Sequence, residues 1–333
     1  MSDVVEITGQ KAASIPVIDI APLRSKSRDE RLAVARQIGE AAQDMGFFYI
    51  ANHGVSPDLV ASAFRLAKEF FSLPLEEKMR LVPPEAHPGR GYGPMHGQAL
   101  EPGTPPDLKE SFIFTLSLPE GDPRVAAGRF GRLPNLWPDS LPEMRVVMER
   151  YQAAMVEVRD LLLTGLALSL GLAEDYFAEY SVEGVEMQRL LHYPPQPPDH
   201  EPGEKGCGAH TDFGGITILK QDEVGGLQVL DDDTGNWIDA PPIPETFVVN
   251  LGDQIQRWTG GRYRSNVHRV ISNAGRDRFS IPFFSNGNPD YLIDSLLTGQ
   301  DGPARAHFEP LTVEQQLIQR ITEVRLTNGA PTP

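Results

Sequence analysis

The 333-residue sequence has a single cysteine, Cys207, and no long apolar run. One cysteine cannot form a disulfide within the chain, which is usual for proteins of a reducing cytoplasm. A membrane-spanning helix needs roughly 18 or more consecutive apolar residues, and the most apolar stretch, residues 161–172, is shorter and interrupted. The first ten residues lack the basic-then-apolar order of a signal peptide. We therefore expect a cytoplasmic protein that does not enter membranes.

Basic residues are also scarce, with 30 Lys and Arg against 46 Asp and Glu, so that the net charge is −16. Nucleic acids and anionic membrane surfaces bind proteins that present a basic face. The composition argues against both as main partners. An anionic small molecule would need a local cationic side chain, because the overall field repels it. We expect a monomer or a weak homodimer.

Helical patterns dominate the first half of the chain, and short strands dominate the second. Ser27 can cap a helix in which apolar residues recur at helical spacing from Leu32 to Ala42. After about residue 185, several short strands are separated by turn residues, which is typical of a sandwich or barrel. Residues 312–324 again have a helical pattern. With no linker between the halves, we expect one α+β domain over residues 1–333 with a mainly β core.

The stretch that follows Gly208 contains two potential metal ligands, His210 and Asp212. On a strand, side chains two residues apart face the same side. Of the remaining histidines, His268 lies in an extended stretch of the β region, whereas the others are poorly placed, among them His87, His96, His200 and His307. Two histidines and one carboxylate on one face of a metal are typical of non-haem iron(II) oxygenases. Zinc is an alternative, but a hydrolytic zinc site would need a general base nearby.

Arg278 and Ser280 form a second pair with i, i+2 spacing, ten and twelve residues after His268. An arginine can bind a carboxylate with two parallel hydrogen bonds, and a serine hydroxyl adds another. If their strand lies beside that of His268, the pair faces the same cavity as the metal ligands. A dicarboxylate that reaches from the metal to the arginine has the shape of 2-oxoglutarate.

The order of these motifs resembles a known family. The segments HTDFGGITILKQDEVGGLQV, FVVNLGDQIQRWTGGRYRSNVHRVISN and RFSIPFF, preceded by IPVIDIAPL and AAQDMGFFYIANHGV, are similar to the iron(II)/2-oxoglutarate dioxygenases of the isopenicillin N synthase-like group. The resemblance covers roughly residues 14 to 290. It implies a distorted double-stranded β-helix, or jelly roll, flanked by helices. It also implies an N-terminal dioxygenase region at 14–130, a catalytic core at 185–290 and a C-terminal helix and tail at 305–333.

The resemblance implies a role for each site residue. His210, Asp212 and His268 would bind Fe(II), and Arg278 and Ser280 would bind the distal carboxylate of 2-oxoglutarate. Tyr193, before a Pro-Pro pair, would add a hydrogen bond to this co-substrate. The family often has Asn-Tyr-Tyr where this chain has Leu191-His192-Tyr193, which removes one polar contact.

The implied reaction consumes 2-oxoglutarate and O2, releases succinate and CO2, and oxidises a small organic molecule, with ascorbate helping to keep the iron reduced. Halogenases of similar fold lack the carboxylate ligand, so Asp212 implies hydroxylation, desaturation, demethylation or ring closure. We expect a role in secondary metabolism. Two alternatives stay open. One is a 2-oxoglutarate-independent iron oxidase or cyclase in which Arg278 and Ser280 hold a substrate carboxylate. The other is a binding protein with a vestigial site, which the intact ligand set disfavours.

Candidate substrate residues come from three segments. Arg90 and Tyr92 lie in a glycine-rich stretch, 89–98, that could close over the substrate or be a surface loop. Phe112 and Phe284 lie on expected strands, where an aromatic side chain lines either the pocket or the core.

Overall fold

The computed structural model describes residues 15–84, 89–116, 118, 121–129, 131–272, 275–296 and 308–327. The N-terminal fourteen residues, His87 and His307 lie outside these ranges. Among the described residues, no helix has both the length and the apolar character needed to cross a membrane.

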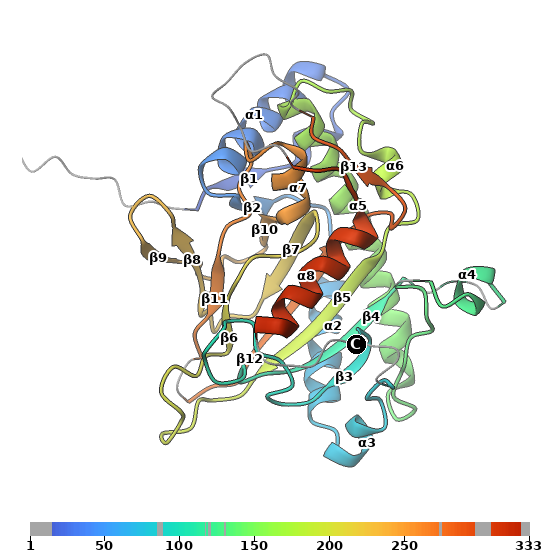
Figure 1. Cartoon of the computed structure of the whole chain (residues 1–333), viewed down its shortest axis with the longest axis vertical. Helices are drawn as coiled ribbons and strands as arrows, with labels where there is room; N and C mark the ends of the chain where they lie inside the picture. The colour runs from blue at the N-terminus through green and yellow to red at the C-terminus, as the bar shows by residue number, and fades with distance from the viewer. Residues whose placement is uncertain are drawn as a thin grey trace, which may run out of the picture.

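Two β-sheets form the centre of the molecule (Figure 1). The eight-stranded sheet has the order β1-β2-β10-β7-β12-β5-β4-β3, and the four-stranded sheet has the order β6-β11-β8-β9. The large sheet consists of β1 (Val17–Asp19), β2 (Phe47–Ala51), β3 (Gly91–Gly93), β4 (Glu110–Thr115), β5 (Glu186–Tyr193), β7 (Ile216–Gln221), β10 (Phe247–Leu251) and β12 (Arg278–Ser285). The small sheet consists of β6 (Cys207–His210), β8 (Leu227–Asp231), β9 (Asn236–Asp239) and β11 (His268–Val270). A third pair, β13 (Leu292–Ile293) and β14 (Leu311–Thr312), is separate.

Helices cover the outer face of the large sheet, where α5 packs against α1, α2, β7 and β12. In Figure 1, α8 crosses the front of the molecule. The helices are η1 (Ala21–Arg24), α1 (Arg28–Asp44), α2 (Pro57–Phe71), α3 (Leu75–Met79), α4 (Pro123–Ala126), α5 (Pro142–Ser169), α6 (Ala178–Ser181), α7 (Asp253–Trp258) and α8 (Val313–Thr327). Ser27 caps α1 as expected, because its hydroxyl accepts a hydrogen bond from the Glu30 amide.

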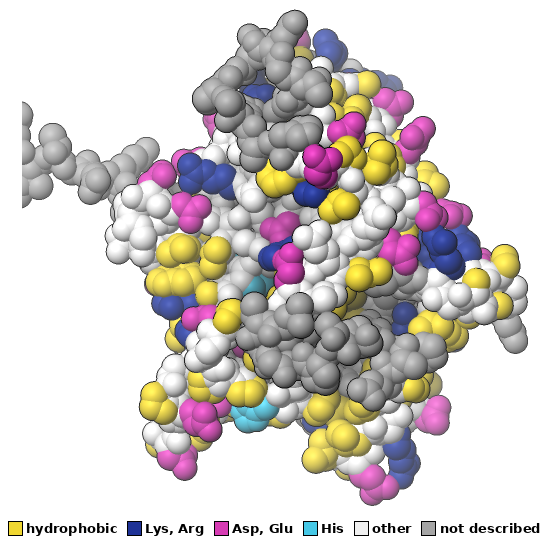
Figure 2. Space-filling view, viewed as in Figure 1, with side chains coloured by type: hydrophobic (Ala, Val, Ile, Leu, Met, Phe, Trp, Pro, Cys, Tyr) yellow, Lys and Arg dark blue, Asp and Glu magenta, His cyan; other side chains and the backbone are white. Residues whose placement is uncertain are grey.

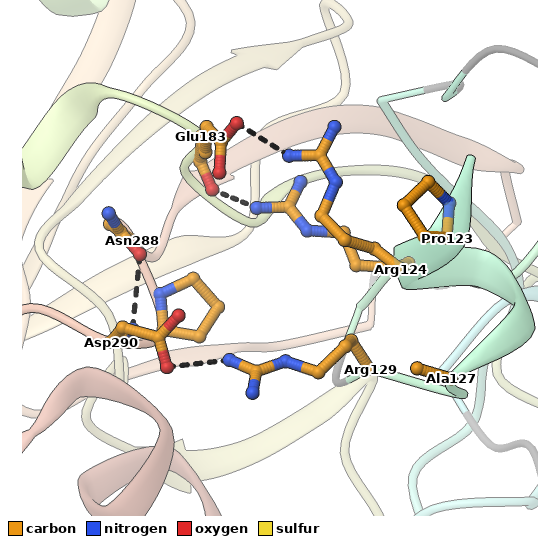
Figure 3. A pocket seen from close by; sticks show the side chains of 9 residues that line it. Pro123, Arg124, Ala127, Arg129, Glu183, Asn288 and Asp290 are labelled. Atoms are coloured by element: carbon orange, nitrogen blue, oxygen red, sulfur yellow. Dashed lines mark hydrogen bonds and ion pairs between the residues drawn. The ribbon is translucent and has the colours of Figure 1, made fainter.

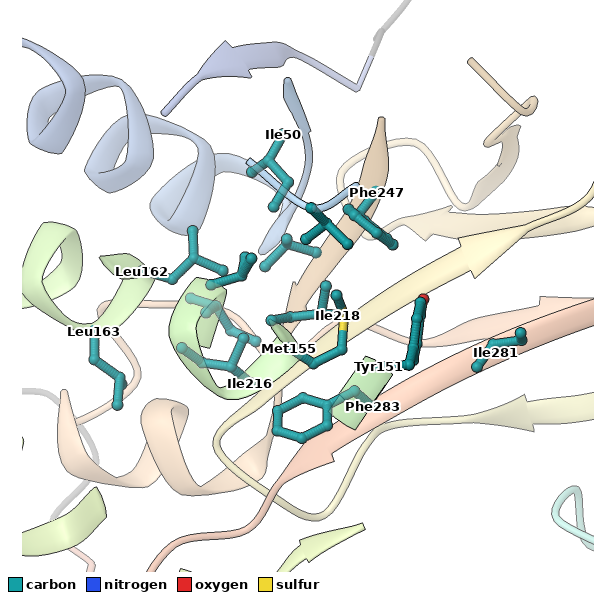
Figure 4. Close-up of a cluster of buried hydrophobic side chains, with 14 of the residues drawn as sticks. Ile50, Tyr151, Met155, Leu162, Leu163, Ile216, Ile218, Phe247, Ile281 and Phe283 are labelled. Atoms are coloured by element: carbon teal, nitrogen blue, oxygen red, sulfur yellow. The ribbon is translucent and has the colours of Figure 1, made fainter. Parts of the chain in front are cut away.

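Alternation along the strands divides the large sheet into two chemically different faces. On the helix side, apolar side chains such as Ile216, Ile218 and Phe283 meet Met155 and Leu162 of α5 (Figure 4). Burial of this apolar surface is the main stabilising contribution to the fold, at roughly 25 cal/mol per Å². The outer face therefore has a structural role and leaves the inner face free for chemistry.

The inner face of the large sheet packs against the small sheet. A second apolar cluster contains Phe47, Tyr49 and Tyr193 from the large sheet together with Cys207 and Val229 from the small one. Polar side chains share this face. The space between the two sheets therefore combines an apolar wall with buried polar groups, as ligand-binding cavities do.

The α+β class and the strands expected after residue 185 are confirmed. The strand of Arg278 does not lie beside the strand of His268, as the sequence analysis had considered. β11 lies in the small sheet and β12 lies in the large one. The pair Arg278 and Ser280 is therefore on the sheet opposite to His268, not on a neighbouring strand.

A polar network on the helix side gives a pH-dependent contribution to stability. His192 Nδ1 lies 2.7 Å from a carboxylate oxygen of Glu110, and its Nε2 lies 2.7 Å from Asp277. Burial alone would lower the pKa of His192, but the hydrogen bonds to Glu110 and Asp277 raise it above the ordinary value. A raised folded-state pKa stabilises the protein below the unfolded value near 6.5, and this stabilisation is lost as the pH rises through the folded-state pKa.

Replacing His192 with glutamine is therefore expected to lower the free energy of unfolding by on the order of 2 kcal/mol at pH 5.5–6, the contribution of a charge-assisted hydrogen bond. The difference from the unsubstituted protein should shrink towards pH 9. Urea unfolding at both pH values measures it. The exposed His200 is the matched control, and His200→Gln should change stability little at either pH. An equal cost for His192→Gln at both pH values would mean that the ring is neutral in the fold.

Candidate metal centre and co-substrate anchor

His210 and His268 face each other across the small sheet. β6 ends at His210, β11 begins at His268, and the two residues are register partners. Their ring centroids are 4.4 Å apart. Asp212 lies two residues beyond the end of β6. Its approach to the histidines therefore comes from a chain that has just left the sheet, and not from strand alternation as the sequence suggested.

The three side chains bring their ligand atoms together. Oδ1 of Asp212 is 3.8 Å from Nε2 of His210 and 3.8 Å from Nε2 of His268. One ligand atom from each residue lies within 4.8 Å of the others. Asp212 and His268 are buried, and His210 is partly buried.

Main-chain carbonyls orient both imidazoles. Nδ1 of His210 is 2.8 Å from the Gly208 carbonyl oxygen, and Nδ1 of His268 is 3.2 Å from that of Asn266. A proton on Nδ1 can be donated to each carbonyl, which leaves each Nε2, 3.8 Å from Asp212 Oδ1, with a free lone pair. Histidines that bind metals commonly use their second nitrogen in this way.

The second oxygen of Asp212 is held by two neighbours on the inner face of the large sheet. Oδ2 accepts hydrogen bonds from the Thr217 hydroxyl at 2.6 Å and from the Asn250 amide at 2.7 Å. Oδ1 is left facing the two histidines. Burial would raise the pKa of Asp212, but the two imidazoles and these hydrogen bonds lower it below the ordinary value.

The donor set fits a divalent metal ion. Burial and the neighbouring His210 lower the pKa of His268 to about 4, so its Nε2 is unprotonated near neutral pH. Two neutral imidazoles and one ionised carboxylate on one side of a point leave the other side open, which suits Fe(II) in non-haem oxygenases. Within the described residues, this is the one group of three or more His, Cys, Asp or Glu side chains that can converge on an ion.

Arg278 and Ser280 lie on the inner face of β12. Arg278 is buried, donates to the carbonyl oxygen of Gly225, and lies 3.2 Å from the Ser280 hydroxyl and 3.3 Å from the Gln221 side-chain oxygen. None of these acceptors carries a charge. A buried guanidinium with only neutral acceptors is prepared to bind an anion.

Tyr193 lies beneath the guanidinium of Arg278. The two residues are register partners on β5 and β12, and the Arg278 guanidinium carbon is 4.7 Å from the Tyr193 ring centroid. Burial raises the pKa of Tyr193, so its hydroxyl stays protonated. The ring orients the arginine by a cation–π contact, and the hydroxyl is a hydrogen-bond donor for an anion beside it.

The C-terminal helix reaches the metal-ligand motif. Arg320 of α8 donates to Asp253 at 2.8 Å and to the hydroxyl of Thr211 at 3.2 Å, and Thr211 lies between the two ligands of the HxD motif. Its guanidinium carbon also lies 5.1 Å from the ring centroid of Phe213. These contacts attach α8 to the chain segment that carries Asp212.

The structure brings only one of the four candidate substrate residues to the space between the sheets. Phe284 shares the inner face of β12 with Arg278, by alternation, and is partly exposed. Phe112 is fully buried on the helix side against Phe70 and Trp137. Tyr92 donates to Glu110 on the same side, and Arg90 donates to the carbonyl oxygens of residues 133 and 134.

Several neighbours of the candidate site carry no recognisable motif in the sequence. Thr217 and Asn250, which hold Asp212, come from separate strands. Lys109 lies 3.0 Å from the Cys207 sulfur and 2.7 Å from Asp107. One signal was available: Arg189 is a charged residue inside an apolar strand pattern, four residues before Tyr193.

A surface pocket of about 300 Å³ lies elsewhere and is lined by three arginines, Arg124, Arg129 and Arg132 (Figure 3). Arg124 pairs with Asp122 and Glu183, and Arg129 pairs with Asp290 at 2.6 Å. Arg132 donates to main-chain carbonyls. Each arginine of this pocket thus has an acceptor within the protein. Acidic and basic side chains are likewise interspersed over the face drawn in Figure 2.

Comparisons with known proteins agree with this geometry. A family model described as the non-haem dioxygenase in morphine synthesis N-terminal region matches residues 15–140, and that of the 2OG-Fe(II) oxygenase superfamily matches residues 184–287. The chain is 40% identical over 306 residues to the 2-oxoglutarate-Fe(II) type oxidoreductase hxnY of Emericella nidulans, covering 91% of this chain and 88% of that one. It is 41% identical over 326 residues to the 2-oxoglutarate-dependent dioxygenase citB of Monascus ruber, covering 95% and 97%.

A solved structure supports the fold. The crystal structure of a 2OG-Fe(II) oxygenase family protein from Caulobacter crescentus superposes with a TM-score of 0.81 at 30% sequence identity, over 93% of this chain and 99% of that one. The expected double-stranded β-helix with flanking helices is confirmed by this likeness.

Proposed function

We propose, from the premise that this chain belongs to the iron(II)/2-oxoglutarate oxygenase superfamily and is a 2-oxoglutarate-dependent dioxygenase, that His210, Asp212 and His268 bind its iron. The observation that carries the proposal is the convergence of Asp212 Oδ1 and the two Nε2 atoms, each 3.8 Å away. The outward-held Oδ2 and the carbonyl-bound Nδ1 atoms support it, because they leave one donor per residue for the metal.

Bound iron would supply the activation of O2 and the oxidative decarboxylation of 2-oxoglutarate to succinate and CO2. The protein's own residues bind and orient the co-substrate. Arg278 and Ser280 would hold the distal carboxylate of 2-oxoglutarate, and Tyr193 would donate a further hydrogen bond. The apolar cluster between the sheets excludes water from the reacting groups.

The proposed outcome is hydroxylation of a small organic molecule, or a related desaturation or demethylation. Asp212 supports this choice over halogenation, because its carboxylate would occupy the position that a halide needs. Phe284 is proposed to line the substrate-binding space. Arg90, Tyr92 and Phe112 are left out, since their contacts lie away from the space between the sheets. A cytoplasmic location, a monomer or weak homodimer, ascorbate dependence and a role in secondary metabolism stay predictions.

The test is consumption of 2-oxoglutarate by the full chain reconstituted anaerobically with Fe(II) and then exposed to O2 with ascorbate. We expect slow succinate formation without a substrate and faster formation with one. Tight binding of 2-oxoglutarate to the Mn(II)-loaded protein, measured by calorimetry, is the second readout. O2 consumption without succinate would favour an oxidase in which Arg278 and Ser280 hold a substrate carboxylate.

A further inference from the structure

Arg189 is a second guanidinium on the inner face of the large sheet. It lies on β5 four residues before Tyr193, so alternation places both side chains on the same face. At about 3.3 Å per residue, the two positions are about 13 Å apart along the strand. Arg189 is therefore a separate group from the anchor at Arg278, at a different depth between the sheets.

The described residues that hydrogen-bond to Arg189 include no carboxylate. Its Nη2 lies 3.0 Å from the Gln98 side-chain oxygen and 3.3 Å from the Ser111 hydroxyl, which are neutral acceptors. Its Nε is buried without a hydrogen-bond partner. Within the part of the chain that the structure describes, Arg189 makes no ion pair. A guanidinium whose Nε is buried without a partner is costly unless a ligand completes it, and Arg189 is partly exposed between the sheets.

Lys109, a neighbouring cation, differs from Arg189 because it has a carboxylate partner. Lys109 is buried, with its ammonium 2.7 Å from Asp107, and the other Asp107 oxygen accepts the Gly208 amide at 2.8 Å. The charge of Lys109 is thus balanced by a carboxylate that is itself fixed to the strand of His210. Of these two cations, Arg189 is therefore the one without a carboxylate partner among the residues that the structure describes.

Apolar side chains lie beside Arg189 on the inner face of the large sheet. Burial lowers the pKa of Arg189, and the ionisable groups of Cys207, Tyr193, Asp107 and Asp212 oppose that shift. In the sheet register, Ile113 is opposite Arg189, and Phe284 is opposite Met187, which places Phe284 diagonally beside Arg189. A ligand bound there would have an anionic end at the guanidinium and an apolar body against Phe284.

We infer that Arg189 binds a carboxylate of the primary substrate, which is a small organic acid with an apolar body. The inference rests on the proposed function, because that function assigns Arg278 to 2-oxoglutarate and so leaves Arg189 for the second reactant. Arg189 would fix the acid end, and Phe284 would pack on the body. The carbon to be oxidised would then lie towards His210 and Asp212.

The experiment uses the Mn(II)-loaded full chain without O2, with and without 2-oxoglutarate. The probes are benzoate, phenylacetate and cyclohexanecarboxylate, each paired with its primary amide, and binding is measured by calorimetry. We expect at least one acid to bind about tenfold or more tightly than its amide, because a charged acceptor makes the stronger hydrogen bond to arginine. Arg189→Gln should weaken that acid by about 10- to 100-fold and abolish the preference.

Two further variants separate charge from folding. Arg189→Lys keeps the cation and should keep a preference for the acid at reduced affinity, which a merely structural role would not produce. Arg129→Gln, at an exposed arginine paired with Asp290, should bind the acids as the unsubstituted protein does. The inference is overturned if no acid of the panel binds, if acids and amides bind alike, or if Arg189→Gln keeps the preference. If an acid binds as expected but 2-oxoglutarate does not bind, the proposed function is contradicted and the inference about Arg189 is not.

Discussion

Replacing Asp212 with alanine is expected to lower Fe(II)-dependent turnover of 2-oxoglutarate by more than about 100-fold, since even partners outside the ligand set typically change metal affinity or activity by 10- to 100-fold. The variant keeps His210 and His268, whose Nδ1 atoms are held by main-chain carbonyls. Two imidazoles on two strands bind a metal less tightly than three donors, and without the carboxylate the site loses its only anionic ligand. The loss should therefore be one of metal affinity, measured by Mn(II) titration followed by electron paramagnetic resonance.

The substitution also has a structural cost that can be separated from the loss of metal. Thr217 and Asn250 donate to Asp212 Oδ2, and removing the acceptor leaves two buried donors unpaired at ~1–3 kcal/mol each. Asp212→Asn keeps the shape and one acceptor oxygen but loses the charge, so it should be the more stable variant and still bind metal weakly. Asp233→Ala, in an exposed turn, is the matched control and should leave metal binding and turnover unchanged. Metal affinity within threefold of the unsubstituted protein in Asp212→Ala would contradict the ligand assignment.

Local pattern was sufficient for the strands after residue 185 and for singling out three side chains that the structure brings together, because both depend on spacing along the chain. The HxD pair, the later histidine and the RxS pair are short motifs, and the strands that carry them are bounded by turn residues. Strand alternation also explains why Arg278, Ser280 and Phe284 share one face of β12. Strand alternation does not explain the convergence of His210 and Asp212, because β6 ends at His210.

The pairing of strands that are far apart in the sequence could not be predicted from local pattern. The sequence does not encode in any local pattern that β11 and β12 belong to opposite sheets, or that Thr217 of β7 and Asn250 of β10 meet at Asp212. The fate of an aromatic residue on a strand depends on which face the helices cover. Phe112 and Phe284 have the same local appearance, yet α2 covers the first and the space between the sheets receives the second. The sequence shows Arg189 as a charged residue inside an apolar strand pattern, but its lack of a carboxylate partner among the described residues is a property of the assembled sheets.

Replacing Arg278 with alanine is expected to raise the concentration of 2-oxoglutarate needed for half-maximal turnover by about 10- to 100-fold, because the charge-assisted hydrogen bond that is lost contributes ~1.5–3 kcal/mol. Metal affinity should persist, since Arg278 donates to Gly225, Ser280 and Gln221, none of which is a metal ligand. The measurement is 2-oxoglutarate titration of the Mn(II)-loaded variant, with metal titration on the same protein. Loss of both affinities together would show that Arg278 supports the metal centre and is not the anchor.

The burial of Arg278 requires a control for packing, because truncation leaves a cavity above the Tyr193 ring and cavities in a core are destabilising in themselves. Arg278→Lys retains the positive charge but not the planar pair of donors, so it should bind 2-oxoglutarate more tightly than Arg278→Ala and less tightly than the unsubstituted protein. Arg276→Ala, two residues earlier and exposed, should change neither affinity. If lysine and alanine weakened 2-oxoglutarate equally, the planar pair of donors of Arg278, and not its charge, would decide binding at this position.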